Sequence, residues 1–536
     1  MVRKQWLCLN GEWELTYRGE KKRILVPFCP ESLLSGTELS PEYGEPLEYS
    51  RTFTVPEAWT GKRILLHFGA VSRIADVKVN GIHVAHHEES FLPFTAEITK
   101  TLQPGENILT VNTVNDLSPQ HCLGKQKKDR GGMWYTPVSG IWQTVWLEPV
   151  PDSYIVSLKI TTGEKWAEIR TEGMDHGTVL MDGEEYPLRR GCARIEIRDP
   201  HPWSPEDPFL YYFTVCCGDD RTESYFALRT LSIQEVREIP RLCLNGKPYF
   251  FHGLLDQGYW SDGLYTPADA KGFERDILAM KALGFNMLRK HIKIEPEQFY
   301  YDCDRLGMIV FQDMVNCGEY RFLRDTALPT VRIQFVLTDR AFHRDPEMRR
   351  NFLQCMEETV MLLGNHPSIC LWTIFNEGWG QFCADDAYDR LKALDPSRFI
   401  DTTSGWFHQN KTDVDSEHQY FGKLHLGKKR RLPQLLSEFG GWSLKYPEHS
   451  YNLEKTFGYR KYTDREDFVR ELKTLYAEQV LPLALKGLCG TVYTEVSDVE
   501  DETNGLLTYD RRQAKVFPGE LEEIGYLLQD AVNSSV

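Results

Sequence analysis

The sequence predicts a chain of three domains, two β-sandwiches followed by a (β/α)8 barrel. A chain of 536 residues is too long for one hydrophobic core. Residues 1–237 carry short alternating strands separated by turn signals, which is typical of sandwiches. From residue 238 onward, apolar runs alternate with amphipathic helices, as in a parallel barrel. We therefore expect domains at 1–150, 151–237 and 238–536.

The first domain reads as all-β. Strands are predicted at 9–15, 49–56, 62–69 and 105–114, and residues 75–84 form a hairpin around Asn80-Gly81. Between the last two strands of this domain lies the glycine-rich, aromatic segment Lys125–Leu147. It is either a long ordered loop packed beneath the barrel, or it reaches the rim of an active site and supplies part of its pocket.

The second domain is a smaller β domain of about 87 residues. Strands are predicted at 153–161, 166–171, 193–197 and 211–215. Trp203 lies in a run of turn formers before a strand and is interpreted as a core anchor, not a binding residue. We find no catalytic or binding motif in the sequence of this domain.

The barrel begins after the hairpin turn at Asn245-Gly246. Helices are expected at 267–283, 295–306, 348–363, 454–485 and 518–528. Residues 315–347 read as a loop-rich insertion and 498–512 as a polar, turn-rich tail. The eight strands are predicted at 249–253, 285–289, 308–311, 369–375, 399–403, a strand that ends at 415–420, 432–438 and 488–494.

Two of these strands run directly into a glutamate. Apolar residues from Ile369 lead into Asn376-Glu377, and the run from Leu432 leads into Glu438 and two glycines. The carboxyl ends of barrel strands form the active face of this fold. Two carboxyl groups facing one another across the barrel mouth are what cleavage of a glycosidic bond requires, one as acid and one as nucleophile.

These motifs resemble glycoside hydrolase family 2, which includes β-galactosidases, β-glucuronidases and β-mannosidases. The resemblance implies a jelly-roll first domain, an immunoglobulin-like second domain and a retaining mechanism. It also implies Glu377 as acid/base and Glu438 as nucleophile. Asn376 would hydrogen-bond the sugar 2-hydroxyl, and Tyr420, in a His-x-Tyr pattern on strand six, would donate to the nucleophile.

Further candidates for sugar binding end or follow the predicted strands. Arg289 can keep the nucleophile ionised by its charge, or form a structural ion pair inside the barrel. Asp313 is a candidate sugar contact, and so are two histidines that can equally be structural. Aromatic side chains near strand ends can supply a platform for a sugar ring. These last two groups are His252, His291, Trp406, Trp442 and Tyr493.

Substrate preference is expected to be β-galactosidase-type. Glucuronidases of this family carry an Asn-x-Lys motif, and the segment Asn452-Leu453-Glu454-Lys455 has the wrong spacing. No Glu-x-His follows strand three, so no metal and no other cofactor is predicted. Glu495 follows strand eight where a neutral amide is expected. Alternatives are a β-glucuronidase or other β-glycosidase, a carbohydrate-binding protein on an inactive barrel, and a transglycosylase.

Composition predicts a protein that binds neither nucleic acid nor membranes. The net charge is −16, which disfavours both polyanions and anionic lipid. The N-terminus lacks the apolar core of a secretory signal, and the thirteen cysteines show no paired spacing. We therefore expect a cytoplasmic protein with reduced, buried thiols that acts on glycosides and can form a homo-oligomer.

Overall fold

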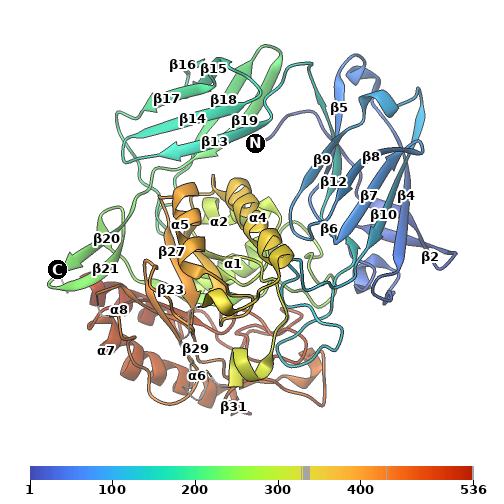
Figure 1. Cartoon of the computed structure of the whole chain (residues 1–536). Helices are drawn as coiled ribbons and strands as arrows, with labels where there is room; N and C mark the ends of the chain where they lie inside the picture. The colour runs from blue at the N-terminus through green and yellow to red at the C-terminus, as the bar shows by residue number, and fades with distance from the viewer. Residues whose placement is uncertain (328, 330–338, 430, 534–536) are drawn as a thin grey trace.

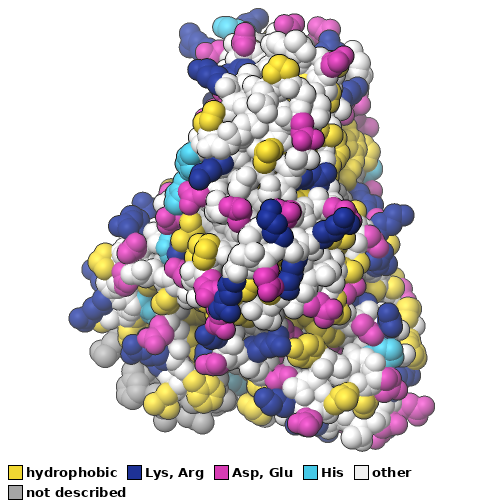
Figure 2. All heavy atoms as spheres, turned by 90° about the vertical axis from the view of Figure 1, so that its right-hand side faces the viewer, with side chains coloured by type: hydrophobic (Ala, Val, Ile, Leu, Met, Phe, Trp, Pro, Cys, Tyr) yellow, Lys and Arg dark blue, Asp and Glu magenta, His cyan; other side chains and the backbone are white. Residues whose placement is uncertain are grey.

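The computed structural model describes residues 1–327, 329, 339–429 and 431–533. Figure 1 shows three domains, with the first (blue) beside the barrel and the second (green) above it. None of the described helices is both long and apolar enough to cross a membrane. Acidic and basic side chains are interspersed over the face seen in Figure 2, so basic residues form no separate patch on that face.

The first domain is an antiparallel sandwich. A six-stranded sheet, in the order β3-β2-β4-β10-β7-β8, packs on a four-stranded sheet, β1-β12-β5-β9. Asn80 and Gly81 have positive φ and form the predicted hairpin turn between β7 and β8. The strands are β1 (Leu7–Cys8), β2 (Gly11–Tyr17), β3 (Glu20–Val26), β4 (Pro46–Thr54), β5 (Arg63–Phe68), β6 (Val71–Ser72), β7 (Ile74–Val79), β8 (Ile82–His87), β9 (Phe94–Glu97), β10 (Glu106–Val114), β11 (Gly140–Ile141) and β12 (Val145–Val150).

The second domain is one seven-stranded antiparallel sheet folded over a shared core. Strand β16 meets β17 through the single pair Arg189↔Cys192, and the apolar residues of both halves form one cluster. Trp203 is fully buried and donates to the backbone oxygen of Asp304, so it anchors this domain to the barrel. The strands are β13 (Ser157–Thr162), β14 (Trp166–Glu172), β15 (His176–Met181), β16 (Glu184–Arg189), β17 (Cys192–Glu196), β18 (Tyr211–Cys217) and β19 (Asp220–Phe226).

A hairpin spans the predicted boundary between the second domain and the barrel. Strand β20 (Leu231–Val236) pairs with β21 (Ile239–Leu244), which pairs with β22 (Lys247–Pro248). The chain therefore enters the barrel through a continuous three-stranded sheet, with no flexible linker at residue 237.

The barrel contains eight parallel strands. Their spatial order is β27-β26-β25-β24-β23-β32-β29-β28, and β27 lies next to β28, which closes the ring. The strands are buried on both faces, as their continuous apolar sequences predict. They are β23 (Phe251–Asp256), β24 (Met287–Lys290), β25 (Ile309–Asp313), β26 (Ile369–Asn376), β27 (Phe399–Ser404), β28 (Asp415–Gln419), β29 (Gln434–Phe439) and β32 (Leu488–Tyr493).

The outer layer of helices is incomplete on one side. In the described part of the chain between β27 and β29 there is no helix. Residues 405–414, 420–429 and 431–433 take that place without forming a helix, so loop residues line this side of the barrel. The longer helices are α1 (Gly272–Ala282), α2 (Glu297–Leu306), α4 (Pro346–Leu363), α5 (Ala384–Leu394), α6 (Arg465–Leu475) and α8 (Glu522–Asn533), with the shorter η7 (Tyr476–Val480) and α7 (Leu481–Ala484).

The insertion 315–347 carries short helical turns, η4 (Leu323–Ala327) and η5 (Asp339–Ala341), and part of it lies outside the described residues. Residues 454–464, expected to be helical, instead contain the short strand β31 (Lys461–Tyr462), which pairs with β30 (Ser443–Leu444). Helix α6 begins only at Arg465, because Asp464 caps its first turn.

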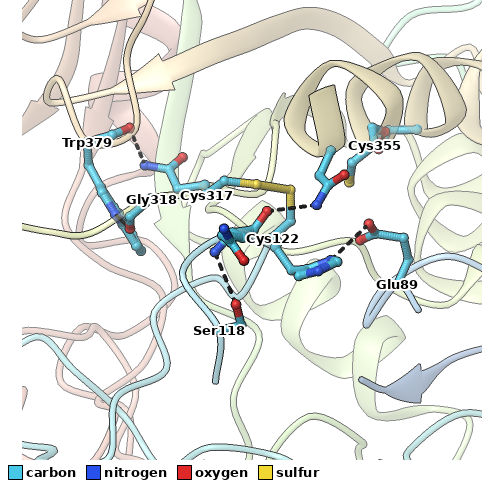
Figure 3. Close-up of a disulfide and its surroundings, with 12 residues drawn as sticks. Glu89, Ser118, Cys122, Cys317, Gly318, Cys355 and Trp379 are labelled. Atoms are coloured by element: carbon cyan, nitrogen blue, oxygen red, sulfur yellow. Dashed lines mark hydrogen bonds and ion pairs between the residues drawn. A yellow bond between two sulfur atoms is a disulfide. The ribbon is translucent and has the colours of Figure 1, made fainter. Parts of the chain in front are cut away.

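A disulfide corrects the prediction that all cysteines are reduced. Cys122 of the first domain is bonded to Cys317, which follows β25, across 195 residues of sequence and 4.4 Å between Cα atoms. Figure 3 shows the bond between the two loops, with Trp379 close to Gly318. The cytoplasmic location and the oligomeric state stay predictions.

Candidate active site

The two predicted carboxyl groups lie at the same end of the barrel. Strand β26 ends at Asn376, and Glu377 follows with φ +53°, a left-handed conformation that is uncommon for a residue with a side chain. Its N–H donates to the backbone oxygen of Ser404 at 3.0 Å, which fixes the turn against β27. Glu438 lies near the end of β29, beside His418 of β28.

His418 lies between the two glutamates. Its Nδ1 is 2.7 Å from Oε1 of Glu377, and its Nε2 is 3.5 Å from Oε1 of Glu438. One oxygen of each glutamate and one ring nitrogen of His418 lie within 4.8 Å of one another. The two carboxyl groups therefore face a common point at the barrel mouth.

Glu438 is held as a carboxylate. It is 4% exposed, and its Oε1 accepts from Nη1 of Arg289 at 3.2 Å. The Tyr420 hydroxyl donates to its Oε2. Burial alone would raise the pKa of Glu438, but the charges of His418 and Arg289 outweigh burial and lower that pKa from 4.5 to about 2.

Glu377 has a different environment. Its side chain is 14% exposed, and the structure shows His418 as its side-chain partner. The other nitrogen of His418 lies 3.1 Å from the Ser404 hydroxyl, which orients the ring. The carboxylate of Glu438 is thus fixed by Arg289 and Tyr420. The carboxyl group of Glu377 is open to the barrel mouth, as acid/base chemistry requires.

Arg289 connects the site to the barrel interior. Its Nε donates to Asp313 at 2.9 Å, and its Nη2 donates to Oδ1 of Asn376 at 2.8 Å. Because Oδ1 of Asn376 is occupied, the amide NH₂ of Asn376 points away from Arg289 and can donate to a sugar hydroxyl. Both roles predicted for Arg289, at the nucleophile and in an internal ion pair, are present together.

Asp313 does not face a sugar. It is 1% exposed, and its two oxygens accept from Arg289 and from Nδ1 of His291, the latter at 2.7 Å. Its expected role as a sugar contact is therefore wrong, and it positions two other side chains instead. His291 then has Nδ1–H bonded to Asp313 and a buried Nε2 without a partner among the described residues.

His252 and Tyr493 lie outside the mouth, which corrects both expectations. His252 is near the start of β23, and its ring packs on Phe285 and Tyr476 between the barrel and its helices. Tyr493 ends β32 but faces outward, with its ring 5.6 Å from Phe439 and beneath Gly440.

The two tryptophans lie at the rim. Trp406 follows β27, and its ring centroid is 5.8 Å from that of His418 at an interplanar angle of 59°. Trp442 follows β29, where the guanidinium of Arg460 lies over its ring at 5.2 Å. Trp406 thus adjoins the His418 ring that lies between Glu377 and Glu438, whereas the ring of Trp442 is covered by the Arg460 cation.

The segment Lys125–Leu147 reaches the rim, the second of its two predicted roles. The Trp134 ring lies 5.0 Å from Trp379, which follows Glu377 by two residues. The Tyr135 hydroxyl donates to Glu502 at 3.0 Å, and the Thr136 N–H donates to Glu500 at 2.9 Å. The first domain therefore forms part of the wall of the site (Figure 1).

Sequence reasoning missed three residues of the site. His418 was visible only as the first member of the His-x-Tyr pattern that contains Tyr420. Tyr459 stacks on Tyr420 with ring centroids 3.9 Å apart, yet it comes from a loop with no recognisable motif. Lys125 begins the segment that was expected beneath the barrel or at its rim, but no motif marks Lys125 itself as a site residue.

The residues Glu377, His418 and Glu438 have the spacing of a metal site. However, the guanidinium of Arg289 and the Tyr420 hydroxyl already use the oxygens of Glu438. A cation beside Arg289 would be repelled, so the donor set fits proton transfer and nucleophilic attack better than metal binding.

Comparison with known proteins identifies the family. The model described as "Glycosyl hydrolases family 2, TIM barrel domain" matches residues 235–438, and "Glycosyl hydrolases family 2, sugar binding domain" matches residues 37–151. A β-glucuronidase of Canis lupus familiaris is 25% identical over 482 residues, covering 77% of this chain and 69% of the relative. A β-galactosidase of Aeromonas hydrophila is 28% identical over 407 residues, covering 68% and 36%.

Solved structures share the fold over the whole chain. A β-D-glucuronidase of Dictyoglomus thermophilum superposes with a TM-score of 0.78 at 19% identity, covering 97% of each chain. A β-galacturonidase of Eisenbergiella tayi gives a TM-score of 0.70 at 20% identity, covering 99% of this chain and 97% of the other. Together with the opposed glutamates, these matches show that the chain is a glycoside hydrolase and belongs to glycoside hydrolase family 2.

Proposed function

We propose that this exo-β-glycosidase is a retaining enzyme whose preferred substrates carry a terminal β-linked uronic acid, with β-glucuronides first. The observation that carries the retaining mechanism is the close approach of Glu377 and Glu438, whose oxygens come within 4.8 Å. Retaining glycosidases hold their carboxyl groups about 5–5.5 Å apart, whereas inverting enzymes need roughly 6.5–9.5 Å to admit a water.

The chemistry follows from the two environments. The carboxylate of Glu438 attacks the anomeric carbon while Glu377 gives its proton to the leaving oxygen, so one C–O bond forms as another breaks. Water then attacks the same carbon, Glu377 takes the proton of that water, and the bond to Glu438 breaks. Tyr420 and Arg289 hold Glu438 ionised for the first step.

Two polar groups are placed to hold the sugar. The side-chain NH₂ of Asn376, beside Glu377, can donate a hydrogen bond to the sugar, and the buried Nε2 of His291 can accept one. Burial and the charge of Lys125 lower the pKa of His291 to about 4, so the ring is neutral at neutral pH and Nδ1 carries its proton toward Asp313.

The preference for uronides rests on the relatives. Those from Canis lupus familiaris and Dictyoglomus thermophilum are β-glucuronidases, and the one from Eisenbergiella tayi is a β-galacturonidase. The β-galactosidase of Aeromonas hydrophila supports β-galactosides as the second candidate, which is the preference expected from sequence motifs.

The test is the rate of release of nitrophenol from a panel of 4-nitrophenyl β-glycosides. The panel contains the glucuronide, galacturonide, galactoside, glucoside and mannoside. We expect kcat/KM to be highest for a uronide, and Glu438→Gln to abolish activity, because an amide cannot attack. Glu448→Gln, at an exposed glutamate on the same side of the barrel, is the matched control.

If the galactoside is the best substrate of the panel, the preference for uronides is wrong and β-galactosides, the second candidate, are the preferred substrates. A native protein that is as inert as Glu438→Gln on every glycoside would identify a carbohydrate-binding protein. Transfer of sugar to added acceptors in place of water would identify a transglycosylase.

A further inference from the structure

Lys125 is a cation at the barrel mouth that belongs to the first domain. Its backbone is fixed on both sides, since the N–H of Leu123 donates to Asn316 at 3.2 Å and the oxygen of Lys125 accepts from Tyr135 at 3.0 Å. Gly124 lies so close to the loop after β24 that an added Cβ would be 2.9 Å from the oxygen of Ile292. This loop is therefore packed directly beside His291.

The disulfide holds the same loop on its other side. Cys122 is three residues before Lys125, and its bond to Cys317 joins the loop to the segment that follows β25 (Figure 3). Two independent attachments, one covalent and one through backbone hydrogen bonds, thus fix the position of Lys125 relative to the barrel.

The ammonium group of Lys125 lacks a protein partner. It makes no hydrogen bond or ion pair with any described residue, in contrast to Lys293, which donates to Gly258, Tyr265 and Glu295. Its charge acts on Glu438, His291 and Glu495, although burial has a larger effect than Lys125 on the pKa of each of these three groups. Its loop packs beside Ile292, just after β24, and is joined to Cys317, just after β25, so Lys125 lies at this end of the barrel.

The part of the barrel mouth next to the Lys125 loop contains buried polar groups whose hydrogen bonds are incomplete. Glu495 is fully buried, and its carboxyl group lies within reach of Glu502 and Gln257, although neither contact has the geometry of an ordinary hydrogen bond. Nε2 of His291 and Nε2 of Gln257 are also buried without a hydrogen-bond partner among the described residues. Buried polar atoms are normally satisfied, so this group indicates a place where a polar ligand completes the hydrogen bonds.

Glu495 is a hydrogen-bond donor in this arrangement. Burial and the neighbouring carboxylate of Glu502 raise the pKa of Glu495 well above 4.5, which keeps it protonated. A protonated carboxylic acid donates as an amide does, which is the residue type expected at that position. One cation and one acidic O–H donor at the same end of the barrel suit a carboxylate ligand.

We propose that Lys125 binds the carboxylate of the terminal uronosyl residue and so determines the preference for uronides over neutral sugars. This inference rests on the proposed function. It assigns recognition of the sugar acid to the first domain, whereas the barrel segment Asn452-Leu453-Glu454-Lys455 has the wrong spacing for the Asn-x-Lys motif of glucuronidases.

The test compares Lys125→Met and Lys125→Arg with the native protein on 4-nitrophenyl β-glucuronide and β-glucoside. We expect Lys125→Met to lower kcat/KM for the glucuronide by about 100-fold or more, mainly through KM, and for the glucoside by less than about threefold, since only the charged pair is lost. Lys125→Arg should stay within about tenfold of the native protein. Lys128→Met, at an exposed lysine that lies 3.6 Å from Glu42, is the matched control.

A second measurement does not depend on turnover. Free D-glucuronate should raise the midpoint of thermal unfolding of the native protein and of Lys128→Met, but not of Lys125→Met, whose midpoint without ligand should equal that of the native protein. An unstable Lys125→Met is replaced in both assays by Lys125→Gln.

The outcomes separate the inference from the function. If the native protein cleaves glucuronides and Lys125→Met loses activity equally on both substrates, or on neither, the inference is overturned while the function stands. If the native protein cleaves neutral glycosides and no uronide, the proposed function fails and the inference fails with it.

Discussion

Replacing Arg289 should move the acid limb of the pH profile. A pKa of Glu438 lowered from 4.5 to about 2 corresponds to roughly 3 kcal/mol in favour of the carboxylate, at about 1.36 kcal/mol per pKa unit. Arg289 and His418 supply that preference against burial. An adjacent arginine typically lowers a carboxyl pKa by about 1–3 units. In Arg289→Gln the pKa of Glu438 should therefore rise to between about 3 and 5.

The sign of the effect is fixed by the mechanism. Glu438 attacks only when ionised, so activity is lost as the pH falls through its pKa, and a higher pKa moves that loss toward neutral pH. The assay is kcat/KM between pH 3 and 9 for the best aryl substrate. Arg289→Gln should also lower kcat/KM at every pH, because the hydrogen bond to Asn376 is lost.

Arg289→Lys separates charge from geometry. Lysine keeps the positive charge but cannot reproduce the contacts to Asp313, Asn376 and Glu438 together. Its acid limb should move less than that of Arg289→Gln, although both variants lose turnover. An acid limb of Arg289→Gln that coincides with the native one would refute the role given to Arg289.

Three further predictions concern the acid/base, the disulfide and a buried histidine. Glu377→Ala should slow cleavage of 4-nitrophenyl glycosides about 10²–10⁴-fold while 2,4-dinitrophenyl glycosides, whose leaving group needs no proton, lose far less; equal losses would contradict the assignment. Cys122→Ser should lower the calorimetric unfolding temperature, because a disulfide typically contributes about 2–4 kcal/mol, and dithiothreitol should destabilise the native protein but not the variant. His252→Ala should lower the unfolding temperature and leave KM unchanged, because the ring packs on Phe285 away from the mouth; a raised KM would return it to the site.

The sequence predicted that Glu377 and Glu438 lie at the same end of the barrel, because each glutamate follows a local pattern. A strand that is buried on both faces can be predicted from its own continuous apolar run, without knowing its neighbouring strands. In a parallel barrel, the residue at its carboxyl end lies at the active face. Glu377 and Glu438 both satisfied this rule, and Arg289 and Asn376 did so as well. The three-domain organisation followed from the same local signals, repeated along the chain.

Errors arose where the register of a strand decides which way a side chain points. Strand β23 ends at Asp256, three residues beyond the predicted end, so His252 lies near its start. Tyr493 is at a strand end, but alternation along β32 turns its ring toward the helices. Asp313 was placed correctly, but its two partners cannot be inferred from spacing.

The sequence left the contribution of the first domain open between two roles, for a different reason. Lys125 and Trp134 lie more than two hundred residues before the catalytic glutamates, and only folding brings them to the mouth. The same holds for Cys122 and Cys317, whose separation of 195 residues carries no recognisable spacing.

The most direct test of the central claim is to trap the covalent intermediate. A 2-deoxy-2-fluoro-β-glycosyl fluoride of the preferred sugar slows hydrolysis of the glycosyl-enzyme, so the adduct can be located by peptide mass spectrometry. We predict one equivalent of sugar on the peptide that contains Glu438, and none in Glu438→Gln. Labelling of another residue, or turnover with inversion at the anomeric carbon and no adduct, would contradict the account.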